Sequence, residues 1–192
     1  SVTQAGLINN LNDGMAWGLF PIVLATKGFS TESIASITAI YPAVWGIGQL
    51  ITGRLADKYC KKNMLYIGML LQGLALILFV RANSFLEYIL LASLLGIGTA
   101  MVYPTFLATI AENTHPEDRA ASLGVFRLWR DSGYAIGAVL TGIVADMFGT
   151  NASVIVVGLL TIFSAAIIFY RMKCRDTLPN QLSKSAVKLS IT

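Results

Sequence analysis

An acidic residue lies inside an apolar stretch near the start of the chain. Helical spacing places four polar or aromatic side chains of this stretch on one face: Asn9, Asn12, Asp13 and Trp17. If this face lines a water-filled cavity, the Asp13 carboxyl can bind a cation or a proton. The alternative is a structural Asp13, neutralised by hydrogen bonds to its Asn neighbours or by a cation from another helix. We interpret the stripe as part of a substrate or proton cavity, with the structural alternative open.

A second stripe carries charges of both signs. It also follows helical spacing, and its members are Arg127, Arg130, Asp131 and Tyr134. Arg127 and Asp131 are four residues apart and can form an ion pair within one helix. We interpret Arg130 and Asp131 as a gate between two conformations and place Tyr134 in the cavity. For Arg127, an ordinary basic helix entrance competes with the gate.

Aromatic and amide side chains follow helical spacing in two further stretches. Tyr41, Trp45 and Gln49 recur at intervals of four, and Tyr103 stands beside a proline. Rings with a polar atom suit the wall of a cavity for an amphipathic solute, and they also suit ordinary packing. Because no strongly ionic binding set is present, the sequence favours neutral, amphipathic or cationic solutes.

Residues for catalysis or metal binding are not clustered in the sequence. The chain has one His and two widely separated Cys, and it has no Gly-rich phosphate loop after a strand. The pI is near 9.2, but the cations lie between apolar stretches, which argues against nucleic-acid binding. We therefore expect no catalytic residues, no metal and no cofactor, and we do not expect an enzyme.

The elements that must position these residues are apolar stretches long enough to cross a bilayer. Hydrophobic residues make up 55% of the chain and charged residues 12%, whereas about a quarter of a soluble protein is charged. A helix of about 20 apolar residues crosses the hydrocarbon core. Six spans are predicted, at residues 5–26, 32–53, 64–81, 86–111, 121–146 and 152–171. The fold class is an all-α membrane protein, with a six-helix unit over residues 1–175 and a flexible cytoplasmic tail over 176–192.

Lys and Arg are distributed unevenly between the two ends of these spans. If the spans alternate in direction, 12 of the 14 cations fall on one side and only Lys27 and Arg81 on the other. The positive-inside rule assigns the basic side, and with it both termini, to the cytoplasmic face of the cell membrane. Cys60 and Cys174 then face a reducing compartment, so we expect no disulfide between them.

The sequence contains an internal repeat. "IGQLITGRLADKY" at residues 47–59 matches "IGAVLTGIVADMF" at residues 136–148 in six of thirteen positions, 89 residues apart. The copies close the second and fifth spans, which are three crossings apart and therefore have opposite orientations. This pattern predicts two inverted three-helix repeats, the plan of secondary transporters. Chance agreement between small apolar residues is the alternative.

The end of the first copy resembles the loop signature of a known family. Residues 53–62, "GRLADKYCKK", are similar to the pattern Gly-x-Leu-Ala-Asp-Arg-x-Gly-Arg-Arg/Lys of the major facilitator superfamily, with Cys60 in place of the second Gly. The resemblance covers residues 5 to about 175 and implies one six-helix half of a twelve-helix fold. The tail "RMKCRDTLP" and a start at Ser1 favour the carboxy-terminal half. The alternative is a natural half-size protein.

The resemblance also implies a role for the charged end of the second span. Asp57 would contact a helix of the opposite half when the cytoplasmic side is closed, and would thereby act as a conformational latch. The residues assigned to this latch are Gly53, Arg54, Asp57, Lys58, Lys61 and Lys62.

The function implied by the resemblance is secondary active transport of a small solute by alternating access, coupled to protons. The expected partners are the lipid bilayer, the solute, protons and the other six-helix half, which is either part of the same polypeptide or a separate chain. The alternative is a non-transporting six-helix membrane module, or a half-size partner that assembles with another chain.

Overall fold

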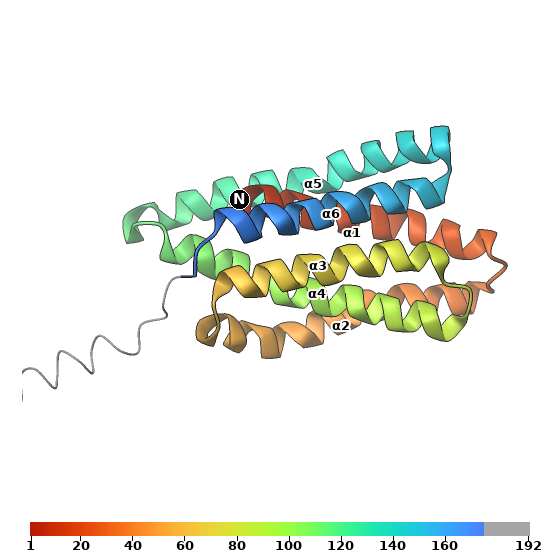
Figure 1. Cartoon of the computed structure of the whole chain (residues 1–192), viewed down its shortest axis with the longest axis horizontal. Helices are drawn as coiled ribbons and strands as arrows, with labels where there is room; N and C mark the ends of the chain where they lie inside the picture. The colour runs from red at the N-terminus through yellow and green to blue at the C-terminus, as the bar shows by residue number, and fades with distance from the viewer. Residues whose placement is uncertain (175–192) are drawn as a thin grey trace, which may run out of the picture.

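Six long helices form a bundle in the computed structural model, which describes residues 1–174 apart from the side chain of Asp57 (Figure 1). They are α1 (Val2–Thr26), α2 (Thr31–Lys58), α3 (Lys61–Arg81), α4 (Phe85–Glu112), α5 (Arg119–Phe148) and α6 (Thr150–Arg171), with the short 3₁₀ turn η1 (Pro116–Asp118) before α5. Each predicted span lies within one of these helices. The all-α prediction is confirmed, and the predicted tail over 176–192 lies outside the described residues.

Local sequence signals set several helix ends. The Ser84 hydroxyl accepts a hydrogen bond from the Glu87 N–H while the Glu87 carboxylate accepts one from the Ser84 N–H, and this capping box starts α4. The Ser30 side chain caps α2. Gly149 has a φ of 87°, which glycine adopts readily, and it makes the tight connection between α5 and α6.

The second helix is longer than predicted. The predicted second span ends at residue 53 and the third begins at 64, but α2 continues to Lys58 and α3 starts at Lys61. Leu, Ala, Arg and Lys are strong helix formers, so this stretch extends the helix rather than ending it. The predicted latch residues from Gly53 to Lys58 therefore belong to a helix.

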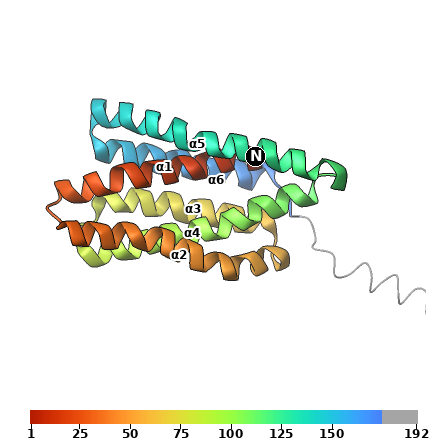
Figure 2. The same ribbon diagram turned by 180° about the vertical axis from the view of Figure 1, so that it is seen from behind.

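The six helices form two groups of three. Figures 1 and 2 show α1, α5 and α6 on one side of the bundle and α2, α3 and α4 on the other. Within the groups, α1 packs along α5 and α2 packs along α4, while α3 and α6 pack against each other and join the groups. Exchanging α1, α2 and α3 for α4, α5 and α6 maps these three contacts onto one another. The predicted inverted repeats are therefore confirmed.

Individual close contacts repeat with the same offset of 89 residues. A Cβ added to Gly48 would lie 2.8 Å from Ala100 Cβ, and one added to Gly137 would lie 3.0 Å from Leu11 Cα. Gly48 is equivalent to Gly137 in the repeat, and Leu11 is equivalent to Ala100. Two further close contacts are related in the same way: Gly96 with Val44, and Gly133 with Leu7. Contacts between α2 and α4 thus recur between α5 and α1.

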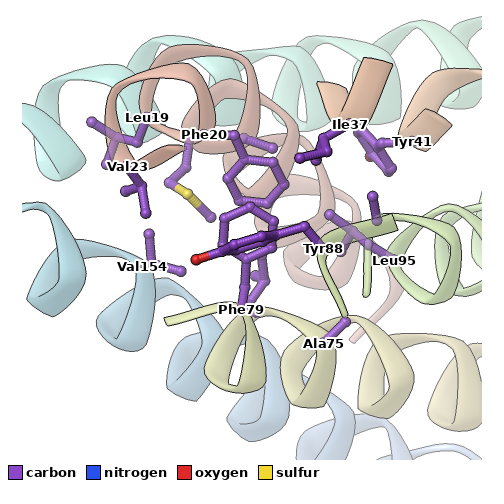
Figure 3. Close-up of a cluster of buried hydrophobic side chains, with 14 of the residues drawn as sticks. Leu19, Phe20, Val23, Ile37, Tyr41, Ala75, Phe79, Tyr88, Leu95 and Val154 are labelled. Atoms are coloured by element: carbon purple, nitrogen blue, oxygen red, sulfur yellow. The ribbon is translucent and has the colours of Figure 1, made fainter. Parts of the chain in front are cut away.

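The interior is layered along the helix axes. One apolar cluster contains Phe20 and Phe79, whose stacked rings have centroids 3.9 Å apart (Figure 3). The second apolar cluster contains Met69 and Ala165, among others. Along α3, Gln72 comes between residues of the two clusters, as Thr161 does along α6. A buried polar layer therefore separates two apolar clusters near the middle of the bundle.

Large apolar side chains also cover much of the outer surface. Leu50 is 75% exposed and Leu128 is 70% exposed. Four helices, α2, α3, α4 and α6, are long and apolar enough to cross a membrane by length and composition. The other two, α1 and α5, are 25 and 30 residues long, and they carry the two polar stripes. These features are those of a membrane-spanning bundle whose polar side chains lie between helices.

Basic residues gather at one end of the bundle. That end holds the carboxyl end of α2, the start of α3, the start of α5 and the end of α6 (left in Figure 1). The opposite end holds Lys27 and Arg81. The remaining predicted cations of the basic side, Arg175, Lys184 and Lys188, lie outside the described residues.

The two cysteines form a disulfide, and the expectation that they would not pair was wrong. Cys60 and Cys174 are bonded, with their Cα atoms 5.5 Å apart. Because α3 and α6 pack along each other, the connection before α3 lies beside the end of α6. The sequence-based expectation considered only the redox compartment and had no information on this proximity.

Candidate functional site

Asp13 is enclosed between α1, α2 and α4. The residue is 1% exposed, and the Tyr41 hydroxyl donates a hydrogen bond to its Oδ1 atom. The same hydroxyl lies 3.2 Å from the Thr99 hydroxyl. Among the described residues, Asp13 Oδ2 has no hydrogen-bond partner and the carboxylate has no ion pair. Asp13 is therefore a buried acid that accepts one phenol hydrogen bond, from Tyr41, and has one oxygen without a hydrogen-bond partner.

Asn9 and Asn12 bond side chains of α3 and α6 rather than Asp13. Asn12 Nδ2 donates to Gln72 Oε1 at 2.9 Å, and Gln72 Nε2 donates to Asn9 Oδ1 at 3.0 Å. The Thr161 hydroxyl lies 2.7 Å from Asn12 Oδ1. None of these four side chains is more than 1% exposed. The stripe predicted on α1 is therefore divided, because Asn9 and Asn12 bond Gln72 on α3 whereas Asp13 bonds Tyr41 on α2.

Arg130 and Asp131 form an ion pair on α5. Arg130 Nη2 and Nε both lie 2.8 Å from Asp131 Oδ1, and Asn10 Nδ2 donates to the same oxygen at 3.1 Å. Arg130 Nη1 donates to the Tyr103 hydroxyl at 2.9 Å, and the guanidinium lies 5.0 Å from the Tyr103 ring centroid. The Arg130 side chain is 10% exposed and that of Asp131 is 51% exposed. Arg130 is thus bound by both Asp131 and Tyr103, while the Asp131 side chain is half exposed.

Arg127 is exposed. Among the described residues, the ion pair expected between Arg127 and Asp131 is absent, since Arg130 pairs with this carboxylate instead. Arg130, the residue next to Asp131, reaches the Asp131 carboxylate instead. Its guanidinium is also bound by the Tyr103 hydroxyl from α4, which keeps it close to Asp131.

The predicted aromatic residues contact one another between helices. Trp17 stacks on Tyr134 with ring centroids 5.6 Å apart, which links α1 to α5. Trp45 stacks on Tyr41 at 6.3 Å and meets the edge of Tyr103 at 5.6 Å, which links α2 to α4. Gln49 lies one turn further along α2 and is half-buried. Two of these phenols contact the charged groups, Tyr41 at Asp13 and Tyr103 at Arg130.

The predicted latch residues lie at the basic end of the bundle. Lys61 forms an ion pair of 2.6 Å with Glu112 on α4, and Lys62 Nζ lies 4.5 Å from the Phe169 ring centroid on α6. Arg54 and Lys58 are exposed, and no atom of another helix closely approaches Gly53. The side chain of Asp57 lies outside the described part of the structure. Lys61 and Lys62 therefore have partners within this bundle.

A hollow of about 700 Å³ lies at the connection between α4 and α5. Its lining includes Asn113, His115, Asp118 and Phe126, and it contains none of the predicted site residues. Within residues 1–174, no group of three or more His, Cys, Asp or Glu side chains could hold a metal ion. The hollow is therefore separate from the polar layer.

Sequence reasoning missed several residues of the polar layer. Gln72, Thr99 and Thr161 were not selected, although each bonds a predicted residue. Gln72 is the one amide in its span, and a lone amide in an apolar span is the signal that could have found it. Thr99 and Thr161 carry no comparable signal, because Thr is common in membrane helices and often bonds its own backbone.

The chain is similar in sequence to known transporters. The sequence profile of the Major Facilitator Superfamily matches residues 3–190. An uncharacterised transporter of Buchnera aphidicola is 26% identical over 141 residues, which cover 73% of this chain and 34% of the relative. An uncharacterised MFS-type transporter of Methanocaldococcus jannaschii is 28% identical over 174 residues, which cover 89% and 44%. The fosmidomycin resistance protein of Escherichia coli is 22% identical over 203 residues, which cover 100% and 50%.

The fold is also similar to that of a solved transporter. A crystal structure of a mutant peptide transporter, POT, in complex with sulfate superposes with a TM-score of 0.80 and 14% identity. The match covers 99% of this chain and 42% of the peptide transporter. The chain therefore spans half or less of the length of these three relatives and of this structure. The inverted-repeat bundle and the profile match over nearly all residues lead to one conclusion: the chain belongs to the Major Facilitator Superfamily.

Proposed function

We propose that this chain is one six-helix half of a secondary transporter that moves a small solute across the cell membrane by alternating access. Asp13 is the group that takes up and releases the coupling proton. Transport of a solute follows from the family and from the transporters among its relatives. The half-transporter role, the proton coupling and the cytoplasmic position of the basic end are the proposed parts.

The observation that carries proton coupling is the environment of Asp13. Its carboxyl is buried at the level of the polar layer, one oxygen has no hydrogen-bond partner, and no described cation forms an ion pair with it. Tyr41 on α2 and Thr99 on α4 belong to the other group of helices. Proton exchange at Asp13 would therefore act on contacts between the two groups, which is where a rocking motion requires a change.

The assembly with a second half is supported by the surface of α2. Ile47, Leu50 and Ile51 are between 63% and 75% exposed, in a helix long and apolar enough to cross a membrane. Relatives with at least twice the matched length have room for a second six-helix unit. We propose that α2 packs on that unit.

Asp13→Asn in the complete transporter tests the coupling. Asn keeps an oxygen to accept the Tyr41 hydrogen bond but cannot exchange a proton. In proteoliposomes with a compound panel and an imposed pH gradient, we expect the variant to lose gradient-driven accumulation and to retain exchange of the same compound at equal pH.

Asp118→Asn is the matched control, because Asp118 is exposed in η1 and lies on the separate hollow. This variant should accumulate the compound like the unmodified protein. Full proton coupling in Asp13→Asn would show that Asp13 is structural. Absence of transport of any panel compound by the unmodified protein would favour a non-transporting module.

A further inference from the structure

Four buried amides form a directed chain of hydrogen bonds through the bundle. Asn12 donates to Gln72, Gln72 to Asn9, Asn9 to Asn10, and Asn10 to Asp131, with donor–acceptor distances of 2.9, 3.0, 3.3 and 3.1 Å. Each amide nitrogen donates to the side-chain oxygen of the next residue. The chain therefore runs in one direction and ends on a carboxylate oxygen.

The hydrogen-bond chain starts where the two repeats meet. Gln72 on α3 and Thr161 on α6 are 89 residues apart, so they are equivalent in the repeat. Both contact Asn12, through its nitrogen and its oxygen respectively. The Thr161 hydroxyl also lies 2.8 Å from the Val157 carbonyl oxygen. Because the hydroxyl has a single proton, it donates either to this carbonyl oxygen or to Asn12 Oδ1. The chain thus connects the α3–α6 contact to α1 and then to α5.

The direction of the chain suits its end point. Aligned amide dipoles polarise one another in a low-dielectric interior, and a hydrogen bond to an ionised acceptor is stronger than one to a neutral acceptor. The last bond reaches Asp131 Oδ1, the oxygen that also receives Arg130 Nε and Nη2. Breaking the hydrogen-bond chain at Gln72 would therefore weaken the hydrogen bond from Asn10 to Asp131 Oδ1, although Gln72 itself bonds neither Asp131 nor Arg130.

We propose that Gln72 is a positioning residue for the Asp131–Arg130 pair, and that it acts through Asn9 and Asn10. The proposal deepens the transport function, because it makes the α3–α6 contact a determinant of the charged group on α5. It requires only that the bundle folds as described, so it can be tested without a known substrate.

Hydrogen–deuterium exchange of the complete transporter in lipid nanodiscs tests the proposal. Gln72→Met cuts the chain with a side chain of similar volume, and Asn10→Leu cuts it beside Asp131. In both variants we expect backbone exchange over residues 126–134 to accelerate about threefold to tenfold, the effect of losing one hydrogen bond between membrane helices. The double variant should exchange no faster than Asn10→Leu alone, since both changes break one series of bonds.

Thr105→Val is the matched control. Thr105 is fully buried on α4 and, within residues 1–174, its hydroxyl donates only to the Met101 carbonyl of its own helix. Its loss should leave exchange over residues 126–134 unchanged. If Gln72→Met does not fold, Gln72→Asn replaces it, because a shorter amide cannot reach both Asn12 and Asn9.

Three results would overturn the proposal: unchanged exchange in a folded Gln72 variant, singles whose effects multiply in the double variant, or equal acceleration in Thr105→Val. Failure of the transport function has a different signature, because it appears as absent solute movement in the unmodified protein. The exchange experiment gives its answer in either case.

Discussion

The two carboxylates near the polar layer have different surroundings. Asp131 has a half-exposed side chain paired with Arg130, whereas Asp13 is buried and bonded to a neutral phenol. A carboxylate that is already paired resists a change of charge, while an unpaired buried one can change its charge with its access to water. The difference favours Asp13 over Asp131 as the proposed proton site.

Tyr41→Phe should remove the hydrogen bond from the Tyr41 hydroxyl to Asp13 while keeping the packing of the ring. The ring is kept, but the carboxyl loses the one hydrogen-bond donor that it has among the described residues, which costs about 1–3 kcal/mol for a buried group. We expect a lower unfolding temperature and a changed pH dependence of transport. Tyr88→Phe is the control, because the Tyr88 hydroxyl also donates inside the bundle, to the Ala82 carbonyl at the Lys27 end. Identical pH profiles for the two variants would contradict a link between Tyr41 and coupling.

At the scale of helices, the close approach of α1 to α5 depends on glycine. An added Cβ on Gly133 would overlap the Leu7 carbonyl oxygen, and one on Gly137 would lie 2.9 Å from that of Leu11. Small residues at such crossings let backbones approach in membranes. The polar stripes of α1 and α5 therefore come together because the backbones do.

Gly133→Ala should separate α1 from α5. Because the new methyl group overlaps backbone rather than a flexible side chain, we expect a loss of about 1–3 kcal/mol, the range for overpacking. Gly142→Ala on the same helix is the control, since within the described residues no side chain or neighbouring helix lies within 4 Å of its added Cβ, and it should be neutral or slightly stabilising. Thermal unfolding of the purified protein measures both, and equal unfolding temperatures would contradict the packing.

For the whole molecule, side-chain contacts tie the helices together at both ends. At one end Lys27 Nζ donates to the Ala82 carbonyl at 2.7 Å and lies 2.9 Å from Asn83 Oδ1. At the basic end Lys61 pairs with Glu112, and Cys60 is bonded to Cys174. Contacts at each end hold the six-helix bundle together. In the proposed complete transporter, a rocking motion would therefore be opposed or favoured by contacts with the second six-helix half.

Asp57→Ala should change the balance of conformations in the complete transporter. We expect fewer molecules closed on the basic side and slower transport, with solute affinity retained, as measured by spin-label distances and equilibrium binding. Asp146→Ala is the control, because Asp146 is the repeat-equivalent acid at the opposite end. Lost affinity with an unchanged conformational balance would contradict a latch.

The cysteine pair tests the orientation of the molecule. If the basic end faces the cytoplasm, we expect that reducing compartment to open the disulfide seen in the structure. Cys60 and Cys174 should then both be thiols in acid-quenched cells and react with maleimide without prior reduction. After mild oxidation of the purified protein they should form the disulfide, because their Cα atoms are 5.5 Å apart. Peptide mass spectrometry measures both states, and Cys60→Ser is the control. A disulfide in the quenched cells would place this end in an oxidising compartment.

The sequence by itself determined the six helices, the inverted repeat and the family. These properties are readable because they depend on local composition and on patterns that recur along the chain. The match of Gly48 with Gly137 shows this most clearly, since the same two positions of the repeat make equivalent contacts in the bundle. The apolar pattern did not predict the end of α2, because charged helix formers extend this helix to Lys58, beyond its apolar part.

Only the tertiary structure decided the partners of the polar side chains. The amides of α1 were assigned to one face with Asp13, but they bond Gln72 and Thr161, which are 60 and 149 residues from Asn12. Asp131 forms its ion pair with Arg130 rather than Arg127, and Tyr103 from α4 binds the same guanidinium. Cys60 is bonded to Cys174 because α3 and α6 pack together. Helical spacing tells which side chains share a face, but the neighbour on that face is chosen by packing between helices that are distant in sequence.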